Sequence, residues 1–391
     1  MNSDLSATIA ALVPELVELR HELHQHPEIR FEERWTSDRI VRFLGEAGIS
    51  CSRGYAGGTG IVAEIQGAGP GKTIALRADI DGLEIQEETG VPYTSLTPGR
   101  MHACGHDGHV AILCGVAKVL ARHASSLNGA VKLIFQPGEE IAAAGRLMVE
   151  EGVLDGVDAA FSLHCWPPLE VGTFGLKSGP MMAGCDCFTI TVTGRGCHGA
   201  HPEYGIDPIV AAAHIIVALQ TVTSREINPQ DLTVVSIGHV KAGHAPTIIP
   251  DTAHLEGTLR TCNDKTRAAA RAAIKRIAHH TAAALRATAT VEFSESYYAP
   301  LINDPAMTEF ARDVLSDTFG PQAISDINDF SMASEDFAFF LQKVPGTYFR
   351  LGTSNADHPP VSIHNAHFDF NDAALEPGIR AFVALTQRCL G

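Results

Sequence analysis

Short apolar runs that end in polar, reactive residues recur through the first half of the chain. Residues 72–81, 130–140 and 157–166 each have the pattern of a buried strand that leads into a polar loop. Apolar residues at helical spacing lie between them, at 110–127 and 143–154. Strands that alternate with helices predict a largely parallel sheet, whose ligand sites collect at the carboxyl ends of the strands.

The order of elements changes after residue 184. From there the pattern predicts strand, helix, strand, strand, helix and strand, which is the split βαβ sandwich of ferredoxin-like domains. The predicted elements span 186–196, 207–222, 232–243, 252–261, 264–285 and 288–296. Because a helix at 305–319 and a strand at 347–352 then resume the first pattern, the small domain is expected to be inserted in the larger one.

We therefore predict an α/β fold with two domains. The larger, built on a mostly parallel sheet, combines residues 1–183 and 297–391, and the inserted ferredoxin-like (βαββαβ) domain covers 184–296. A length of 391 residues agrees with two domains, since single hydrophobic cores rarely grow beyond roughly 250 to 300 residues.

Composition narrows the possible partners and the compartment. The chain has 29 Lys and Arg against 45 Asp and Glu and no basic run, which argues against nucleic acid. Residues 1–28 have the spacing of an amphipathic helix and not of a signal peptide, and we expect no apolar run of the ~18 to 20 residues that span a membrane. We interpret the chain as a cytoplasmic protein whose nine cysteines are reduced thiols.

The stretch "MHACGHDGH", residues 101–109, holds the first candidate metal ligands. Cys104 and His106 stand two residues apart, so an extended loop would point both side chains to one side. Thiolate and imidazole suit zinc and similar divalent metals. Taken alone the pair is a weak signal, because Cys104 could instead be a nucleophile with a histidine partner, or the stretch a plain polar loop.

Three further groups strengthen the metal reading. Glu139 and Glu140 follow an apolar strand, so one can bind metal while the other faces a water as general base; the alternative is a solvated acidic turn. His164 and His364 both have the pattern of a strand-end histidine, although either could be a hydrogen-bonded structural residue. Together with the cysteine and histidine of the first stretch, these residues describe a two-metal hydrolytic centre better than one closed structural site.

A series of motifs in fixed order resembles the M20 metallopeptidase family, in its amidohydrolase branch. That branch includes hippurate hydrolase, auxin amino-acid conjugate hydrolases and N-acyl amino acid deacetylases, and the resemblance covers nearly the whole chain. The motifs are "RADIDGLEI", "MHACGHDGH", "PGEE", "LHCWP", "GRGCHGAHP", "IIPDTAHLEGTLRT", "SEDFAFF" and "IHNAHFDF".

The resemblance implies an amidohydrolase that cleaves the amide bond of small N-acyl or N-aroyl amino acids and releases a carboxylic acid and a free amino acid. It implies two divalent metal ions per subunit, with Mn, Zn, Co and Ni all open. It also implies that the larger domain is catalytic, that the inserted domain serves as lid and dimerisation domain, and that the protein forms a homodimer or a dimer-based oligomer.

The resemblance also assigns roles at the metal centre. Glu139 is the general base, and Asp79 orients a ligand from behind. Some relatives carry a histidine ligand two residues before this aspartate, where this chain has Arg77. The implied metal ligands are Cys104, His106, Glu140, His164 and His364.

On the substrate side the resemblance implies fewer residues. His198 corresponds to a histidine that reaches across a dimer to stabilise the oxyanion, with His201 as a neighbour, and Arg260 to an arginine that meets the substrate carboxylate. Thr247 stands where relatives usually have Asn, which changes the polar contact there. Arg350 lies in a strand that relatives fill with apolar residues; it would recognise an acidic substrate group or, as we favour, face solvent.

Two other functions stay open at this level. A dipeptidase or aminopeptidase would need a group that receives a free substrate ammonium. A non-catalytic binding protein that retains the metals has no need of a base such as Glu139. Within the first stretch, Asp107 and His109 are expected to brace the loop and the start of its helix, and His102 has no assigned task.

Overall fold

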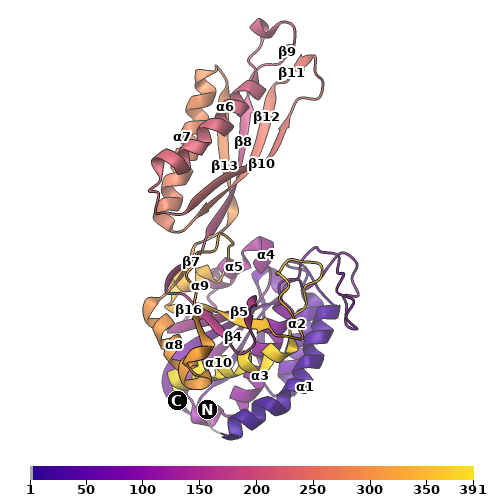
Figure 1. Cartoon of the computed structure of the whole chain (residues 1–391), viewed down its shortest axis with the longest axis vertical. Helices are drawn as coiled ribbons and strands as arrows, with labels where there is room; N and C mark the ends of the chain where they lie inside the picture. Colours follow the sequence, from indigo (N-terminus) through magenta and orange to yellow (C-terminus); the bar gives the residue numbers. More distant parts are fainter. Residues whose placement is uncertain (1–2) are drawn as a thin grey trace. The chain divides into compact units, whose positions relative to one another are not determined.

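A computed structural model describes residues 3–391. The chain divides into two compact units (Figure 1). Unit 1 contains the chain as far as Gly179 together with Ile302–Asp329 and Asp336–Gly391, and unit 2 contains Pro180–Leu301 and Phe330–Glu335. The segment 184–296, expected as an inserted domain, lies within unit 2.

Unit 1 is built on an eight-stranded sheet of order β1-β2-β4-β3-β5-β16-β6-β15. The central pairs β4–β3, β3–β5 and β5–β16 are parallel, as predicted, whereas β1–β2, β2–β4 and β16–β6 are antiparallel. The sheet is therefore mixed, with parallel pairs at its centre and a further parallel pair, β6–β15, at one edge. The strands are β1 (Cys51–Tyr55), β2 (Gly60–Gln66), β3 (Gly69–Asp79), β4 (Asn128–Gln136), β5 (Ala159–Glu170), β6 (Phe174–Leu176), β15 (Ile324–Asp326) and β16 (Gly346–Ser354).

Helices surround this sheet. Helices α1, α3 and α10 contact one another, and α3 and α10 also contact β3, so their apolar side chains share one core with the sheet (Figure 1). The last six residues of β3 are all buried, as expected of a central parallel strand covered on both faces. The helices of unit 1 are α1 (Ser3–Gln25), α2 (Arg34–Glu46), α3 (His106–Arg122), α4 (Glu139–Ala142), α5 (Ala144–Glu150), α8 (Pro305–Phe319), α9 (Ala338–Lys343) and α10 (Leu375–Leu390).

Unit 2 has the predicted split βαβ order. Its four strands form an antiparallel sheet of order β10-β12-β8-β13, and α6 and α7 contact each other and β12. A short pair, β9 with β11, stands apart from this sheet. The elements are β8 (Gly184–Thr193), β9 (Cys197–His198), α6 (Pro208–Thr221), β10 (Thr233–Ala242), β11 (Ile248–Ile249), β12 (Thr252–Thr261), α7 (Asp264–Ala284) and β13 (Thr288–Tyr298), while β7 (Gly179–Met182) and β14 (Leu301–Asn303) contain points where the chain passes between units.

We expected no apolar run long enough to span a membrane, but α6 and the residues that follow it form a helix of that length and apolar composition. The helical segment Pro208–Glu226 has 19 residues, and an 18-residue window within it has a mean hydropathy of 1.2, with 33% of that window buried. Asp207 caps it by accepting hydrogen bonds from the first-turn amides. Its inner face, with Ile215 and Leu219, belongs to the core of unit 2, so part of its apolar character serves ordinary packing.

Candidate metal centre

The loop before α3 places Cys104 and His106 next to each other in space. Gly105 between them has a φ of 82°, in the left-handed region that glycine adopts without strain. A Cβ at this position would lie 2.6 Å from the sulfur of Cys165, so a larger residue would clash. The glycine therefore lets α3 begin at His106 while the loop stays packed on β5.

His106 has one ring nitrogen bound to protein and the other open. Nδ1 lies 2.9 Å from the backbone oxygen of Asp81 and 3.2 Å from its Oδ1. Nε2 is buried without a hydrogen-bond partner among the described residues, 3.7 Å from Asp79 Oδ2 and 3.8 Å from Glu140 Oε1. Burial lowers the pKa of His106, but Asp79, Asp81 and Glu140 raise it overall to about 10, so without a cation both ring nitrogens carry protons. A cation bound among these carboxylates would replace the Nε2 proton, which is the arrangement of a metal-ligating histidine.

His164 repeats this arrangement in the middle of β5, so the expectation that it ends a strand is wrong. Its Nδ1 donates to the backbone oxygen of Cys165 at 2.8 Å, and its Nε2 lies 3.4 Å from the sulfur of Cys104. Burial and the nearby imidazoles lower the pKa of His164 well below its ordinary value, so the ring is neutral. Burial and the charge of Glu140 raise the pKa of the Cys104 thiol, a shift that a bound cation would reverse.

Glu140 and His364 complete the group. His364 Nε2 lies 3.1 Å from Glu140 Oε1, and the backbone N–H of His364 donates to Ala103 at 2.7 Å, which holds the two segments together. His364 has a φ of 60° and lies in a turn; within the described chain, 361–370 contains no strand, so the expectation of a strand-end histidine is wrong. The ligand atoms of Cys104, His106 and Glu140 all lie within 4.8 Å of one another.

Asp79 and His109 support the ligands from behind. Asp79 Oδ1 accepts from His109 Nδ1 at 2.6 Å, and its Oδ2 accepts from Arg77 at 2.7 Å. His109 Nε2 accepts from the backbone N–H of Cys165 at 2.9 Å, so both of its nitrogens are used within the protein. Burial alone would raise the pKa of Asp79, but His106, His109 and Arg77 hold it well below its ordinary value. His109 thus braces the site and has no lone pair left for a metal.

Two carboxylates that support the candidate ligands, Asp81 and Glu33, were not predicted from the sequence. Asp81 contacts His106, as above, and its Oδ2 accepts from the backbone N–H of Glu140 at 3.0 Å. Glu33 accepts from the N–H of Gly138 at 3.0 Å, so it fixes the turn before α4. Burial and the charge of Asp81 raise the pKa of Glu33 to about 8. The Asp-x-Asp spacing of "RADIDG" was a signal for Asp81, whereas nothing near Glu33 in sequence pointed to this site.

A second buried network ties α1 to the first turn of α3. Arg20 Nη1 lies 3.4 Å from Asp107 Oδ2 and 3.0 Å from Asp369 Oδ1, and His24 Nδ1 lies 2.9 Å from Asp107 Oδ2. Burial lowers the pKa of His24, but its bonds to Asp107 and Glu87 raise it overall to about 9, so the histidine is charged at neutral pH. Asp107 is therefore anchored, in agreement with the bracing role expected for it.

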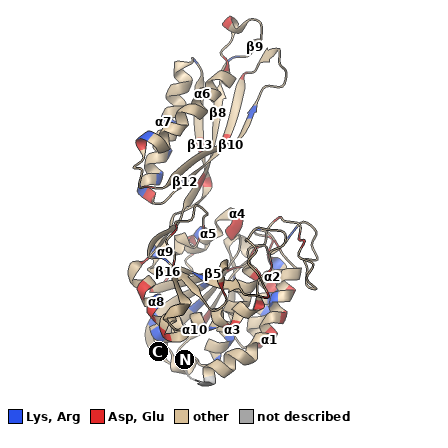
Figure 2. Cartoon of the chain, in the orientation of Figure 1, with Lys and Arg blue, Asp and Glu red and all other residues tan. Residues whose placement is uncertain are grey.

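Glu139 and His102 are both buried near the candidate ligands in the sequence. Glu139 is the first residue of α4, and its side chain is buried; Figure 2 shows the acidic character of this short helix. Gly138 precedes it in the left-handed conformation.

His102 is fully buried, and neither of its ring nitrogens has a hydrogen-bond partner among the described residues. Burial lowers its pKa to about 4.

The expected substrate residues of the inserted segment lie in unit 2. His198 on β9 is exposed, and its Nδ1 accepts from the N–H of Ala200 at 3.0 Å, which leaves the proton on Nε2. The His201 ring lies 5.8 Å away. Thr247, in the turn before β11, lies close by, since its backbone oxygen accepts from the N–H of Gly199 at 2.7 Å. Arg260 on β12 donates to the Met332 and Ser334 oxygens at 2.7 and 3.4 Å.

Arg350 does not face solvent as we favoured. Its exposed fraction is 8%, and its guanidinium lies over the Trp166 ring. The reading as a solvent-facing strand residue is wrong, because β16 is an interior strand buried along its whole length.

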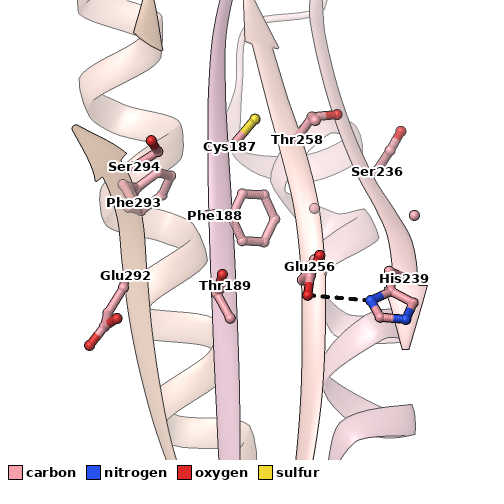
Figure 3. Close-up of a pocket in the computed structure, with 12 residues that line it drawn as sticks. Cys187, Phe188, Thr189, Ser236, His239, Glu256, Thr258, Glu292, Phe293 and Ser294 are labelled. Carbon is pink, nitrogen blue, oxygen red and sulfur yellow. Dashed lines mark ion pairs between the residues drawn. The ribbon is translucent and has the colours of Figure 1, made fainter. Parts of the chain in front are cut away.

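One surface hollow lies in unit 2, away from the candidate ligands. It has a volume of about 480 Å³ and covers the side of the unit 2 sheet drawn in Figure 3. His239 and Glu256 form an ion pair of 3.3 Å there. None of the candidate ligands lines this hollow, so its size does not bear on the metal centre.

Comparisons with known proteins show what the chain is similar to. The model of peptidase family M20/M25/M40 matches residues 75–388. The chain is 41% identical over 367 residues to an N-acetyl-L-cysteine deacetylase of Bacillus subtilis, covering 94% of this chain and 86% of the relative. It is 36% identical over 375 residues to thermostable carboxypeptidase 1 of Saccharolobus solfataricus, covering 95% and 94%.

Among solved structures, a dinuclear metal binding peptidase of the M20 family from Bacillus subtilis superimposes with a TM-score of 0.84. It is 37% identical, and the match covers 97% of this chain and 99% of that one. The family match, the relatives and the fold agree. The chain therefore belongs to peptidase family M20, in its amidohydrolase branch, and is a metal-dependent amide hydrolase.

Proposed function

We propose that the enzyme hydrolyses the amide bond of N-acyl and N-aroyl amino acids to a carboxylic acid and a free amino acid. The observation that carries the proposal is the pair of buried histidines, His106 and His164, whose Nε2 atoms face a cysteine and carboxylates while their Nδ1 atoms are held by backbone oxygens. The similarity to an N-acetyl-L-cysteine deacetylase supports this substrate class.

The donor set fits two divalent cations. Thiolate, imidazole and carboxylate suit Zn, Mn, Co and Ni alike, so the resident metal is left to experiment. Bound there, the cations would acidify a water molecule and polarise the amide carbonyl. A similar solved structure is that of a dinuclear metal binding peptidase. The proposed ligands are Cys104, His106, Glu140, His164 and His364.

Glu139 is the proposed general base. It neighbours the ligand Glu140 on α4, and its side chain is buried, where a carboxylate interacts strongly with a nearby proton. It accepts the proton of the attacking water and then returns it to the leaving nitrogen. Asp79 keeps His109 oriented behind the ligands throughout.

Unit 2 is the proposed lid and dimerisation domain, with the catalytic domain in unit 1. His198, whose Nε2 carries the proton, would donate to the oxyanion of a second subunit, and Arg260 and Thr247 would bind the substrate carboxylate region. The exposed apolar side chains Ile209 and Val217 on the outer face of α6 support a homodimer, because such a face is stabilised by a partner. We place the enzyme in the cytoplasm, with its cysteines reduced; all nine are free thiols.

A reconstitution experiment tests the proposal. Metal-depleted protein is supplied with Mn, Zn, Co or Ni and assayed on N-acetyl, N-benzoyl and indoleacetyl amino acids. We expect turnover only with metal, and a fall of about 10²- to 10⁴-fold in Glu139→Gln but not in the matched surface variant Glu150→Gln on α5. Turnover without metal, or full activity of Glu139→Gln, would refute the mechanism.

Peptide hydrolysis is a second candidate, because one relative is a carboxypeptidase. Comparing Gly-Phe with acetyl-Phe separates the two functions: a peptidase cleaves the dipeptide, whose amino group is free, whereas the proposed enzyme prefers the acylated substrate. A binding protein without activity would show no turnover of either.

A further inference from the structure

Arg350 is a buried cation beside the metal centre to which the reaction described above gives no task. It lies on β16 and pairs in register with His164 on the neighbouring parallel strand β5. Residues in register on adjacent strands project from the same face of a sheet, and the strands are about 4.8 Å apart. Arg350 therefore flanks a proposed metal ligand on that ligand's own side of the sheet.

The surroundings hold the guanidinium in place but do not neutralise it. Its Cζ lies 3.6 Å from the centroid of the Trp166 ring, a cation–π contact that fixes the plane of the group. Among residues 3–391 no carboxylate lies within ion-pair distance of it; the Asp329 charge acts only from farther away. Burial lowers the pKa of Arg350, although arginine stays charged. A buried, permanently charged group without a counter-ion is costly unless a ligand supplies one.

The guanidinium is also reachable. The residue as a whole is 8% exposed. Within the described chain, none of its side-chain nitrogens is both fully buried and without a hydrogen-bond partner. Since the guanidinium makes no hydrogen bond to any described residue, each nitrogen keeps some contact with solvent. Its planar fork of donors matches a carboxylate, with which it can form two parallel hydrogen bonds.

We propose that Arg350 binds a second carboxylate of the substrate, so that the enzyme favours N-acyl amino acids that carry one acidic group beyond the α-carboxylate. This rests on the proposed function, in which Arg260 already serves the α-carboxylate. The second carboxylate has two possible sources, the side chain of an acidic amino acid or the free end of a dicarboxylic acyl group. Both present the same group to Arg350, and the substrates below separate them.

Two isosteric substrate pairs test the proposal on the metal-loaded enzyme. The first compares N-acetyl-Glu with N-acetyl-Gln, and the second compares N-succinyl-Ala with its terminal monoamide. In Arg350→Met, which keeps an unbranched chain against Trp166, we expect the acidic-to-neutral ratio of kcat/KM to fall about 10- to 100-fold in one pair, mainly through KM. The pair that changes identifies the source of the carboxylate.

Controls separate recognition from structure. Arg350→Lys keeps the charge without the fork and should lie between wild type and Arg350→Met. Arg312→Gln removes an arginine that pairs with Asp326 on the surface of unit 1 and should leave both ratios unchanged. Asp329→Asn should also leave the preference in place, because Asp329 is not the group that Arg350 binds. Metal content and Tm are measured for every variant.

The outcomes are distinct. Ratios in Arg350→Met within twofold of wild type, or an equal loss on all four substrates, overturn the inference and identify Arg350 as a structural partner of Trp166. A wild type that hydrolyses N-acetyl-Ala but neither acidic substrate also overturns it, while the proposed function stands. Failure of the metal-loaded wild type on every N-acyl amino acid refutes the proposed function itself, and the inference with it.

Discussion

Replacing Arg20 by Met should destabilise unit 1 through the buried carboxylate of Asp107. Arg20 and Asp107 are both fully buried, and the arginine connects α1 to the first turn of α3. Removing one member of a buried ion pair typically costs about 3–5 kcal/mol, because the other charge stays in the protein. Asp107 keeps His24 at 2.9 Å, and the partly exposed Asp369 and Asp372 can be solvated, so we expect the lower end, about 3 kcal/mol.

Urea unfolding followed by tryptophan fluorescence measures this loss. Both tryptophans of the chain, Trp35 and Trp166, lie in unit 1, so the signal reports on that unit alone. The matched control is Arg39→Met, since Arg39 pairs with the half-exposed Glu22 and should lose less than about 1 kcal/mol.

A double-mutant cycle identifies the partner. If Arg20 acts mainly by compensating the Asp107 charge, Asp107→Asn removes the need for it, and the two changes together should cost at least 1 kcal/mol less than their sum. Additive losses, or a loss in Arg20→Met no larger than in Arg39→Met, would refute the reasoning.

Further predictions concern the supports of the site and pH. His109→Phe should weaken metal binding about 10- to 100-fold, measured by competition with a chelator, because it leaves Asp79 Oδ1 without its donor; unchanged affinity would show that this bond does not position the ligands. The pKa of His24 is raised from 6.5 to about 9, so its contribution is complete below pH 6.5 and is lost as pH rises through 9. Urea titrations should show a loss of about 3 kcal/mol across this window that is absent in His24→Gln, and equal pH profiles would contradict the shift.

Much of the fold was predictable from the sequence, because the residues that face a core give each helix and strand a regular spacing of apolar positions. The alternation in unit 2 predicted every strand and helix of the split βαβ order, with β12 correct at both ends. The antiparallel strands β1 and β2 were not recognised. β1, "CSRGY", is an exposed edge strand without an apolar alternation, so only its pairing with β2 defines it.

The candidate metal ligands were predictable because they lie in short sequence motifs. The residues that support them were not, because their contacts join segments that are far apart in the sequence. Glu33 and Asp81 act through bonds to backbone amides of α4 and the turn before it, and such contacts leave no spacing pattern. Arg350 was misread because a charged residue in a strand usually faces water. Its burial depends on Trp166 from another strand, which no local pattern reveals.

Metal content measured together with activity tests the central claim most directly. We predict close to two divalent ions per chain in the active enzyme, loss of N-acyl amino acid hydrolysis when they are removed, recovery when they are restored, and a content below two in His106→Asn and His364→Asn. Full activity with one ion or none, or an unchanged content of two in both variants, would contradict the account.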